Sequence, residues 1–283
     1  MTLIEHLYEL RRRLFKAAIF VVLGTVVGWL FYNHILDVLK EPYCSLPASH
    51  RIQAGNGSDK CTLLFFGPLD GFLIRLKVSA ISGLILSSPF WLYQLWAFIT
   101  PGLKKSERRL TVIFVLCSTV LFIGGAALAF LTLSKGLHLL IGSAGDGTAA
   151  ALAVTNYLSF VMAMLLIFGI SFEFPLLVVM LNRVGVLSYE RLRKWLRAIV
   201  FMVFVFAAIA TPSQDPFTMC ALAVPMCVLF GVALLIARSH DKRKHALEAA
   251  AAFHDVPDDQ ASPLDTTPTP VDAPDSVDDE SPH

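Results

Sequence analysis

Charged residues are scarce in this 283-residue chain, and the motifs of soluble enzymes are missing from it. Asp, Glu, Lys and Arg make up 16% of the sequence and hydrophobic residues 55%, whereas soluble domains carry about 25% charged and roughly 45–50% apolar residues. The sequence has no Gly-rich phosphate loop, no spaced Cys/His cluster and no nucleophile elbow. We therefore expect an integral membrane protein with no metal, no cofactor, no catalytic residue and no nucleic-acid partner.

Basic residues are absent from the C-terminal segment. From Ala246 onward the chain holds ten acids, six prolines and no Lys or Arg, so residues 1–245 carry all 23 basic residues against 12 acids. The segment also has few large apolar side chains, and burial therefore cannot offset the entropy of ordering it. We expect it to be a disordered, acidic, Pro-rich tail.

Six stretches are long and apolar enough to predict membrane-crossing helices. They cover residues 14–33, 71–99, 110–134, 157–184, 196–210 and 218–237. The fifth has 15 residues, about 22 Å of helix against a hydrocarbon core of roughly 30 Å, and the sixth is borderline. A re-entrant hairpin is the alternative for this last pair, although the charges at each end favour true crossings. Pro89, Pro175 and Pro225 predict kinks in three of the helices, which suggests a curved or cupped surface.

The distribution of Lys and Arg predicts the orientation. Of the 23 basic residues, 17 fall in four clusters on one side of the predicted helices, at 11–16, 104–109, 183–197 and 238–244. Because cytoplasmic loops are enriched in Lys and Arg, both termini are predicted to be cytoplasmic. The predicted organisation is an amphipathic N-terminus (1–13), a six-helix transmembrane domain (14–237) and the tail (238–283). The N-terminus has two acids and no small-residue cleavage site, so we expect the first span to be retained.

Two of the five cysteines lie in the first outer loop, at about residues 34–70. Cys44 and Cys61 would face an oxidising compartment, where a disulfide between them would add about 3 kcal/mol of stability. Two free thiols are the alternative.

Glu173 is the most informative single residue. It lies ten residues before Arg183, about 15 Å of helix from the cytoplasmic end and close to the bilayer centre. An ionisable group at that depth costs at least roughly 2.5 kcal/mol, so it is a functional-site hypothesis by default. A protonated or paired structural Glu is the alternative, and no basic residue lies at the same depth in another span.

Two further acids have simple local interpretations when taken alone. Glu9 is four residues from Arg13 and from Glu5, which is consistent with a solvated helical turn held by a weak salt bridge. Glu107 follows Ser106, a plausible N-cap, so its acid would complement the helix dipole.

Four regions of the sequence resemble the TatC family, the multispanning core of the twin-arginine protein translocase. They are "HLYELRRRL" before the first span, "SSPFWLYQLWAFITPGLKKSERR" across the second span and its following loop, "YLSFVMAM" with "FGISFEFP" in the fourth span, and "TPSQDPFTMCALAVPM" across the last turn. Together they extend from residue 6 to about residue 230, in the family's order.

The resemblance implies a fold and a function. The fold would have six helices, both termini in the cytoplasm and a concave, cupped shape. The function would be to bind signal peptides with two consecutive arginines and to assemble, as a homo-oligomer within a larger complex, with single-span TatA- and TatB-type proteins. Folded proteins would then be exported across the bacterial cytoplasmic membrane, driven by the proton-motive force and without enzymatic chemistry.

The resemblance also implies roles for individual residues. Signal-peptide binding is carried over to Glu9, Glu107, Phe98, Arg11 and Arg13, the intramembrane functional acid to Glu173, and the outer-turn and partner contacts to Asp215 and Thr211. A guanidinium favours carboxylate partners, so a Glu at the water–lipid boundary suits the recognition of arginine. The rival interpretation is a proton-coupled secondary transporter of a small solute that uses Glu173, although no internal repeat supports it. An intramembrane enzyme is disfavoured because no catalytic set is present.

Overall fold

The computed structural model describes residues 3–44, 67–99, 108–142, 154–213 and 215–254. These residues form α-helices and no strands, which confirms the predicted all-α class for the described part of the chain. Contacts divide the chain into two compact units, Met1–Ser239 and His240–His283. The predicted membrane domain lies within the first unit.

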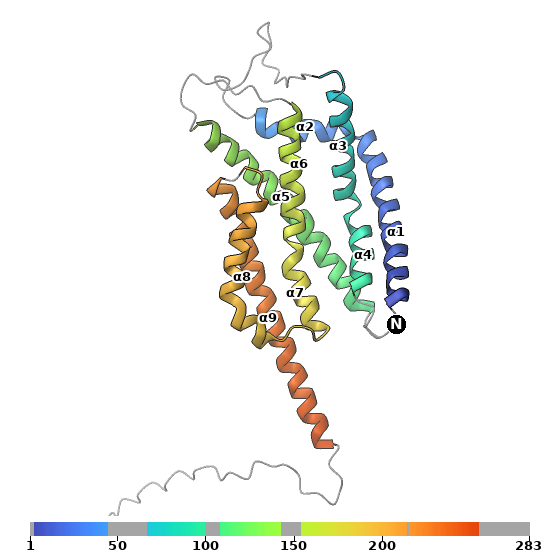
Figure 1. Ribbon diagram of the computed structural model, residues 1–283, viewed down its shortest axis with the longest axis vertical. Coiled ribbons are helices and arrows are strands. Elements are labelled where there is room, and N and C mark those ends of the chain that lie inside the picture. Colours follow the sequence, from blue (N-terminus) through green and yellow to red (C-terminus); the bar gives the residue numbers. More distant parts are fainter. Residues whose placement is uncertain (1–2, 45–66, 100–107, 143–153, 214, 255–283) are drawn as a thin grey trace, which may run out of the picture. The chain divides into compact units, whose positions relative to one another are not determined.

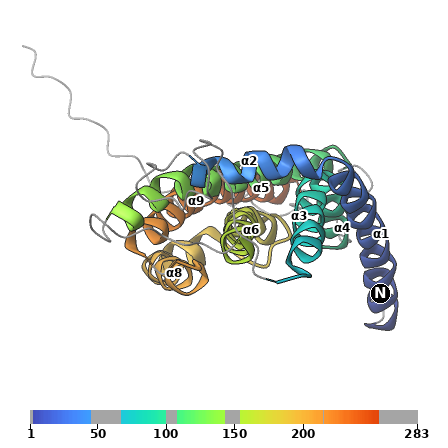
Figure 2. The ribbon, with the colours of Figure 1, turned by 90° about the horizontal axis from the view of Figure 1, so that it is seen from above.

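The N-terminal segment and the first span form one continuous helix, α1 (Leu3–Leu30). Phe31 separates it from α2 (Tyr32–Cys44), so the beginning of the predicted outer loop is helical. The hydroxyl of Tyr157 donates a hydrogen bond to the carbonyl of Leu39 at 3.0 Å, and its ring lies 5.6 Å from that of Tyr43. Tyr157 belongs to α6 (Val154–Ser171), so these contacts hold α2 against α6. α2 turns away from α1 and also contacts α3 and α5 (Figures 1 and 2).

Two of the predicted spans are broken next to a proline. The second consists of α3 (Asp70–Leu86) and α4 (Ser88–Ile99), bent by 61°, and Pro89 lies in the first turn of α4. The fourth consists of α6 (Val154–Ser171) and α7 (Glu173–Arg183), with Pro175 in the first turn of α7. Proline lacks an N–H group and is tolerated in a first helical turn, so each break falls just before the ring. Pro225 differs, because the helix around it continues without interruption.

The remaining helices are longer than their predicted apolar stretches. They are α5 (Arg108–Gly142), α8 (Tyr189–Ala210) and α9 (Pro216–His254). The segment predicted to be disordered from residue 238 therefore begins as helix, since its Ala, Lys, Arg and Leu residues are good helix formers. Residues 255–283 lie outside the described part of the chain.

Membrane-compatible helices account for most of the predicted spans. Within the described residues, four helical segments are long and apolar enough to cross a membrane, or five when α3 and α4 count as one span. α8 is not among them, because charged residues recur in its first turns as far as Arg197 and only residues 198–210 form an uninterrupted apolar run. A count of six crossings therefore stays a prediction.

Glycines allow two pairs of helices to pack closely. A Cβ atom added to Gly24 of α1 would lie 2.4 Å from the carbonyl oxygen of Gly83 in α3. A Cβ added to Gly125 of α5 would lie 2.7 Å from the carbonyl oxygen of Phe168 in α6. Small residues permit this approach where helices pack by van der Waals contact in a membrane. The second pair positions the helices that flank Glu173.

Candidate functional site

The N-terminal helix α1 carries a salt bridge between Glu9 and Arg13. Nε and Nη2 of Arg13 donate to the same oxygen of Glu9, Oε1, at 2.9 and 2.6 Å. Among the described residues, no hydrogen bond to the other oxygen, Oε2, is found, and the side chain of Glu9 keeps 25% of its surface exposed. The carboxylate thus has one engaged oxygen and one available oxygen. Arg11 lies 4.8 Å from the ring centre of Tyr8 on the same helix.

Aromatic contacts hold this part of α1 against α4. The rings of His6 and Phe98 are stacked with centres 4.5 Å apart, and those of Phe20 and Phe90 are stacked 5.1 Å apart. Phe98 is the penultimate residue of α4, so the segment bearing Glu9 lies beside the end of that helix. Glu107 lies outside the described residues, so the arrangement described for Glu9 does not include it.

Glu173 ends a chain of hydrogen bonds from three helices. The hydroxyl of Ser118 in α5 donates to Glu173 Oε2 at 2.6 Å. The same hydroxyl accepts a bond from the indole Nε1 of Trp96 in α4 at 2.8 Å. Ser118 and Trp96 are fully buried, so water does not replace these partners.

The second carboxyl oxygen of Glu173, Oε1, is buried and has no hydrogen-bond partner among the described residues. Those residues also provide no ion pair for Glu173, in line with the absence of a basic residue at its depth in the sequence. A buried polar atom without a partner is costly. The site therefore offers one acceptor position that is not used by the surrounding helices.

Asp215 and Thr211 have structural roles at the turn between α8 and α9. The two carboxyl oxygens of Asp215 accept bonds from the backbone N–H and the hydroxyl of Thr218, at 2.8 and 2.6 Å, so Asp215 caps α9. Burial alone would raise the pKa of the Asp215 carboxyl, but hydrogen bonds involving Ser213 and Thr218 outweigh it and lower that pKa. Thr211 is buried and donates to the carbonyl of Ala207 at 2.9 Å.

The cysteines are only partly described. Cys44 at the end of α2 is disulfide-bonded, while Cys117, Cys220 and Cys227 are free thiols. The expected partner, Cys61, lies outside the described residues, so its pairing with Cys44 stays a prediction.

Three residues of these sites were not singled out as functional by the sequence. Ser118 and Trp96 hold Glu173, and His6 packs on Phe98. A serine and an indole N–H within apolar spans were the available signal, because each needs a partner when it is buried. The pairing itself joins positions far apart in the chain, which spacing does not reveal.

Comparisons with known proteins agree on one family. Residues 5–225 match the family described as "Sec-independent protein translocase protein (TatC)". A protein of that name from Frankia casuarinae is 53% identical over 266 residues, which cover 94% of this chain and 73% of its own length. Another, from Corynebacterium kroppenstedtii, is 38% identical over 294 residues, which cover 98% and 70% of the two chains.

A solved structure gives the same result for the fold. The crystal structure described as "Twin Arginine Translocase Receptor- TatC in DDM" is similar with a TM-score of 0.69 at 30% identity. The match covers 82% of this chain and 99% of that one. The family is one of translocase proteins rather than enzymes, and the rival interpretation as a small-solute transporter has no support from it. The chain belongs to the TatC family and is a membrane protein of the Sec-independent protein translocase.

Proposed function

We propose that this chain is the receptor subunit of the translocase and binds twin-arginine signal peptides at its cytoplasmic face. The observation that carries the proposal is the stacking of His6 on Phe98, with ring centres 4.5 Å apart. This contact keeps Glu9 beside the end of α4, from which the chain leads towards Glu107. The description of the similar crystal structure as a twin-arginine translocase receptor supports the same role.

The chemistry of the α1 site suits an arginine ligand. Oε2 of Glu9 is available to a guanidinium while Oε1 holds Arg13, which fixes the orientation of the carboxylate. A guanidinium carries its N–H donors in a fixed planar fork, which lysine does not reproduce, and these donors form charge-assisted hydrogen bonds with a carboxylate oxygen. Leu7, Leu14 and Phe15 are exposed on α1 and provide apolar surface for the hydrophobic part of a signal peptide. In this proposal Glu107, Arg11 and Arg13 complete the site.

The same proposal includes the topology and the assembly. Six crossings would alternate in direction, and in Figure 1 the direction reverses from α1 to α3 with α4, then to α5, to α6 with α7, to α8 and to the start of α9, while α2 lies across them. The four Lys/Arg clusters then face the cytoplasm, and the protein lies in the bacterial cytoplasmic membrane with a concave surface. TatA- and TatB-type single-span proteins and further copies of this chain would complete the complex. The complex would export folded proteins, driven by the proton-motive force.

Two further residues receive roles in this proposal. Glu173 would act as the functional acid within the membrane, because Oε1 is buried without a partner among the described residues. The turn containing Thr211 and Asp215 would contact partner subunits on the outer side. Its rigid cap on α9 supports this role, since a fixed turn presents a constant surface.

A binding experiment on the purified full-length chain tests the receptor proposal. A fluorescent signal peptide with the Arg-Arg pair is titrated with wild-type protein, and its anisotropy gives the dissociation constant. A second peptide with Lys-Lys in place of Arg-Arg is its control. Loss of one charge-assisted hydrogen bond costs about 1.5–3 kcal/mol, so Glu9→Gln is expected to weaken Arg-Arg binding roughly 10- to 150-fold. Glu107→Gln is expected to have a similar effect.

A matched variant separates recognition from general charge. Glu190→Gln removes an acid from the first turn of α8 and is expected to leave the dissociation constant unchanged. Equal binding of the Arg-Arg and Lys-Lys peptides by the wild type would contradict the proposal, as would binding of neither. Equal weakening by Glu190→Gln and Glu9→Gln would show that only net charge matters.

A further inference from the structure

An open apolar groove lies between α7, α8 and α9, away from the α1 site. It has a volume of about 730 Å³ and is lined by 13 residues, among them Phe174 and Val178 of α7, Trp195 and Met202 of α8, and Phe230 of α9. Cavities of about 300–1,000 Å³ typically bury small-molecule ligands. Trp195 and Met202 are 70% and 61% exposed, so the groove is open along its side. We call it the α7–α8 groove.

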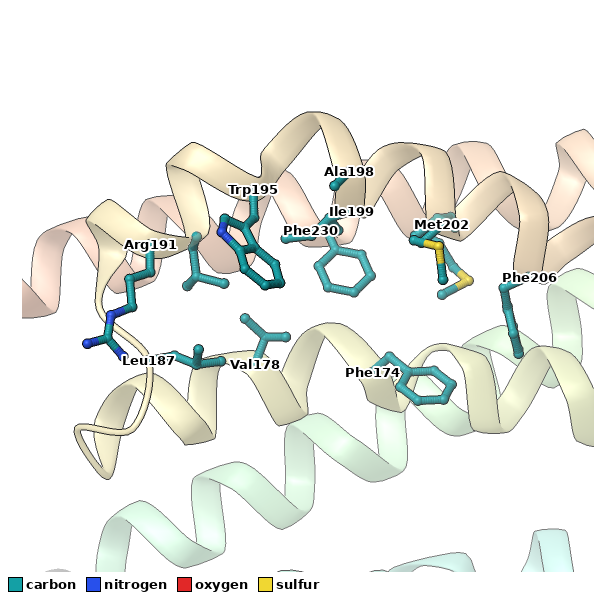
Figure 3. Close-up of a pocket in the computed structure, with 13 residues that line it drawn as sticks. Phe174, Val178, Leu187, Arg191, Trp195, Ala198, Ile199, Met202, Phe206 and Phe230 are labelled. Atoms are coloured by element: carbon teal, nitrogen blue, oxygen red, sulfur yellow. The ribbon is translucent and has the colours of Figure 1, made fainter.

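The groove has a single charged residue, at one end. Arg191 lies at that end and Phe206 at the other, with Trp195 next to the arginine (Figure 3). From Arg191 to Phe206 the helix advances about 22 Å, so the groove is shorter than the roughly 30 Å hydrocarbon core that a membrane-spanning helix crosses. A Trp near the charged end matches the aromatic residues typical of the membrane–water interface.

Further basic residues lie close in the chain to this end of the groove. Arg193, Lys194 and Arg197 follow Arg191 on α8, and Arg183 ends α7, whereas Glu190 is the acid in this stretch. Among the described residues, no salt bridge is found for Arg191. The end of the groove is therefore suited to an anion, while the rest of its lining is suited to a hydrocarbon chain.

We propose that the α7–α8 groove binds an anionic glycerophospholipid, with one acyl chain along α8 and the phosphate at Arg191. The dimensions favour a lipid over a membrane-spanning partner helix. A membrane-spanning helix would present apolar surface across the whole hydrocarbon core and would extend beyond the groove, and its apolar surface would offer no counterpart to the cation at the end of the groove. A lipid places its phosphate at the interface and its chain in one leaflet. This site is separate from the proposed peptide site and does not depend on it.

Native mass spectrometry of the purified full-length chain tests the proposal. The protein is titrated with dioleoyl-phosphatidylglycerol or dioleoyl-phosphatidylcholine, which have the same acyl chains and differ in headgroup charge. The wild type is expected to retain the anionic lipid preferentially. A basic residue near the membrane surface contributes about 1 kcal/mol to attraction of anionic lipid, so Arg191→Gln is expected to reduce this preference about five-fold. Arg193→Gln removes a neighbouring charge outside the lining and is expected to change it less.

A second pair of variants tests the apolar part of the groove. Ala198→Trp fills the groove from α8 and is expected to lower retention of both lipids, whereas Leu196→Trp adds the same side chain outside the lining. If Arg191→Gln and Arg193→Gln reduced the preference for the anionic lipid equally, the proposal would be overturned. It would also be overturned if Ala198→Trp retained as many lipid molecules as the wild type. The spectra also report the mass of the assembly. If Ala198→Trp removed a protein subunit instead of lipid, the groove would be a helix-docking surface and the proposal would be wrong.

Discussion

The contact of α5 with α6 at Gly125 provides the sharpest test of the packing that supports Glu173. A Cβ atom at this position would lie 2.7 Å from the carbonyl oxygen of Phe168, 3.0 Å from its carbonyl carbon and 3.1 Å from the Cα atom of Gly169. All three neighbours are backbone atoms, which do not move aside by changing rotamer. The adjacent Gly124 has nothing within 4 Å of the same position. Gly125→Ala and Gly124→Ala therefore make the same chemical change in different surroundings.

Two effects determine the expected free energies of unfolding of these variants. Replacing Gly by Ala within a helix gains about 0.8–1.0 kcal/mol from helix propensity, and this gain applies to both variants. Overpacking costs about 1–3 kcal/mol and applies only to Gly125→Ala, where the helices have to separate. The propensity effect cancels when the two variants are compared. Gly125→Ala is thus expected to be less stable than Gly124→Ala by about 1–3 kcal/mol.

Chemical denaturation of both variants in the same detergent, followed by circular dichroism, measures this difference. Tryptophan emission adds a local probe, because the indole of Trp96 is bonded to Ser118, two turns before Gly125 on α5. Separation of α5 from α6 is expected to change that emission in Gly125→Ala and leave it unchanged in Gly124→Ala. Equal stabilities of the two variants would refute the close approach and the argument built on it.

Two further substitutions test the hydrogen bonds described above. Ser118→Ala removes a hydrogen-bond partner of Glu173 and of Trp96 and is expected to lower the free energy of unfolding by about 1–3 kcal/mol. Thr119→Ala should cost less, because in the described part of the chain the hydroxyl of Thr119 bonds to the carbonyl of Val115 in its own helix. Similar losses in the two variants would contradict the network. Asp215→Ala removes the cap of α9 and should cost about 0.5–2 kcal/mol at pH 7. Because the pKa of Asp215 is lowered on folding from the usual 3.8, its stabilisation is present above that value and is lost as the pH falls through the lower, folded-state pKa. The difference between wild type and Asp215→Ala should therefore shrink in acid, and a difference that grows would refute the cap.

Local features of the fold were predictable from the sequence. Pro89 and Pro175 indicated the breaks in the second and fourth spans, since proline affects only the turn in which it lies. The bond between Glu9 and Arg13 followed from their spacing of four residues. The helical start of the first outer loop was missed, because α2 is stabilised by contacts with Tyr157, more than a hundred residues away.

Long-range contacts account for what the sequence did not reveal about the site. Glu173 could be recognised from its depth in an apolar helix, but Ser118 and Trp96 lie 55 and 77 positions earlier in the chain. Neither residue forms a spacing pattern with Glu173. The packing of α4 and of α7 against α5 brings the three side chains together. The stacking of His6 on Phe98 depends in the same way on how α1 packs against α4.

One helix, α7, borders both the intramembrane acid and the groove. Glu173 faces Ser118 of α5, whereas the next residue, Phe174, lines the groove and packs edge to face with Phe206 of α8, ring centres 5.7 Å apart. Successive residues of a helix point about 100° apart, so these two side chains serve different neighbours. A substitution of Phe174 would alter the groove at a position directly next to Glu173. Arg191 and Ala198 lie on α8 and do not contribute to the Glu173 network, and for this reason their variants separate lipid binding from the function of the acid.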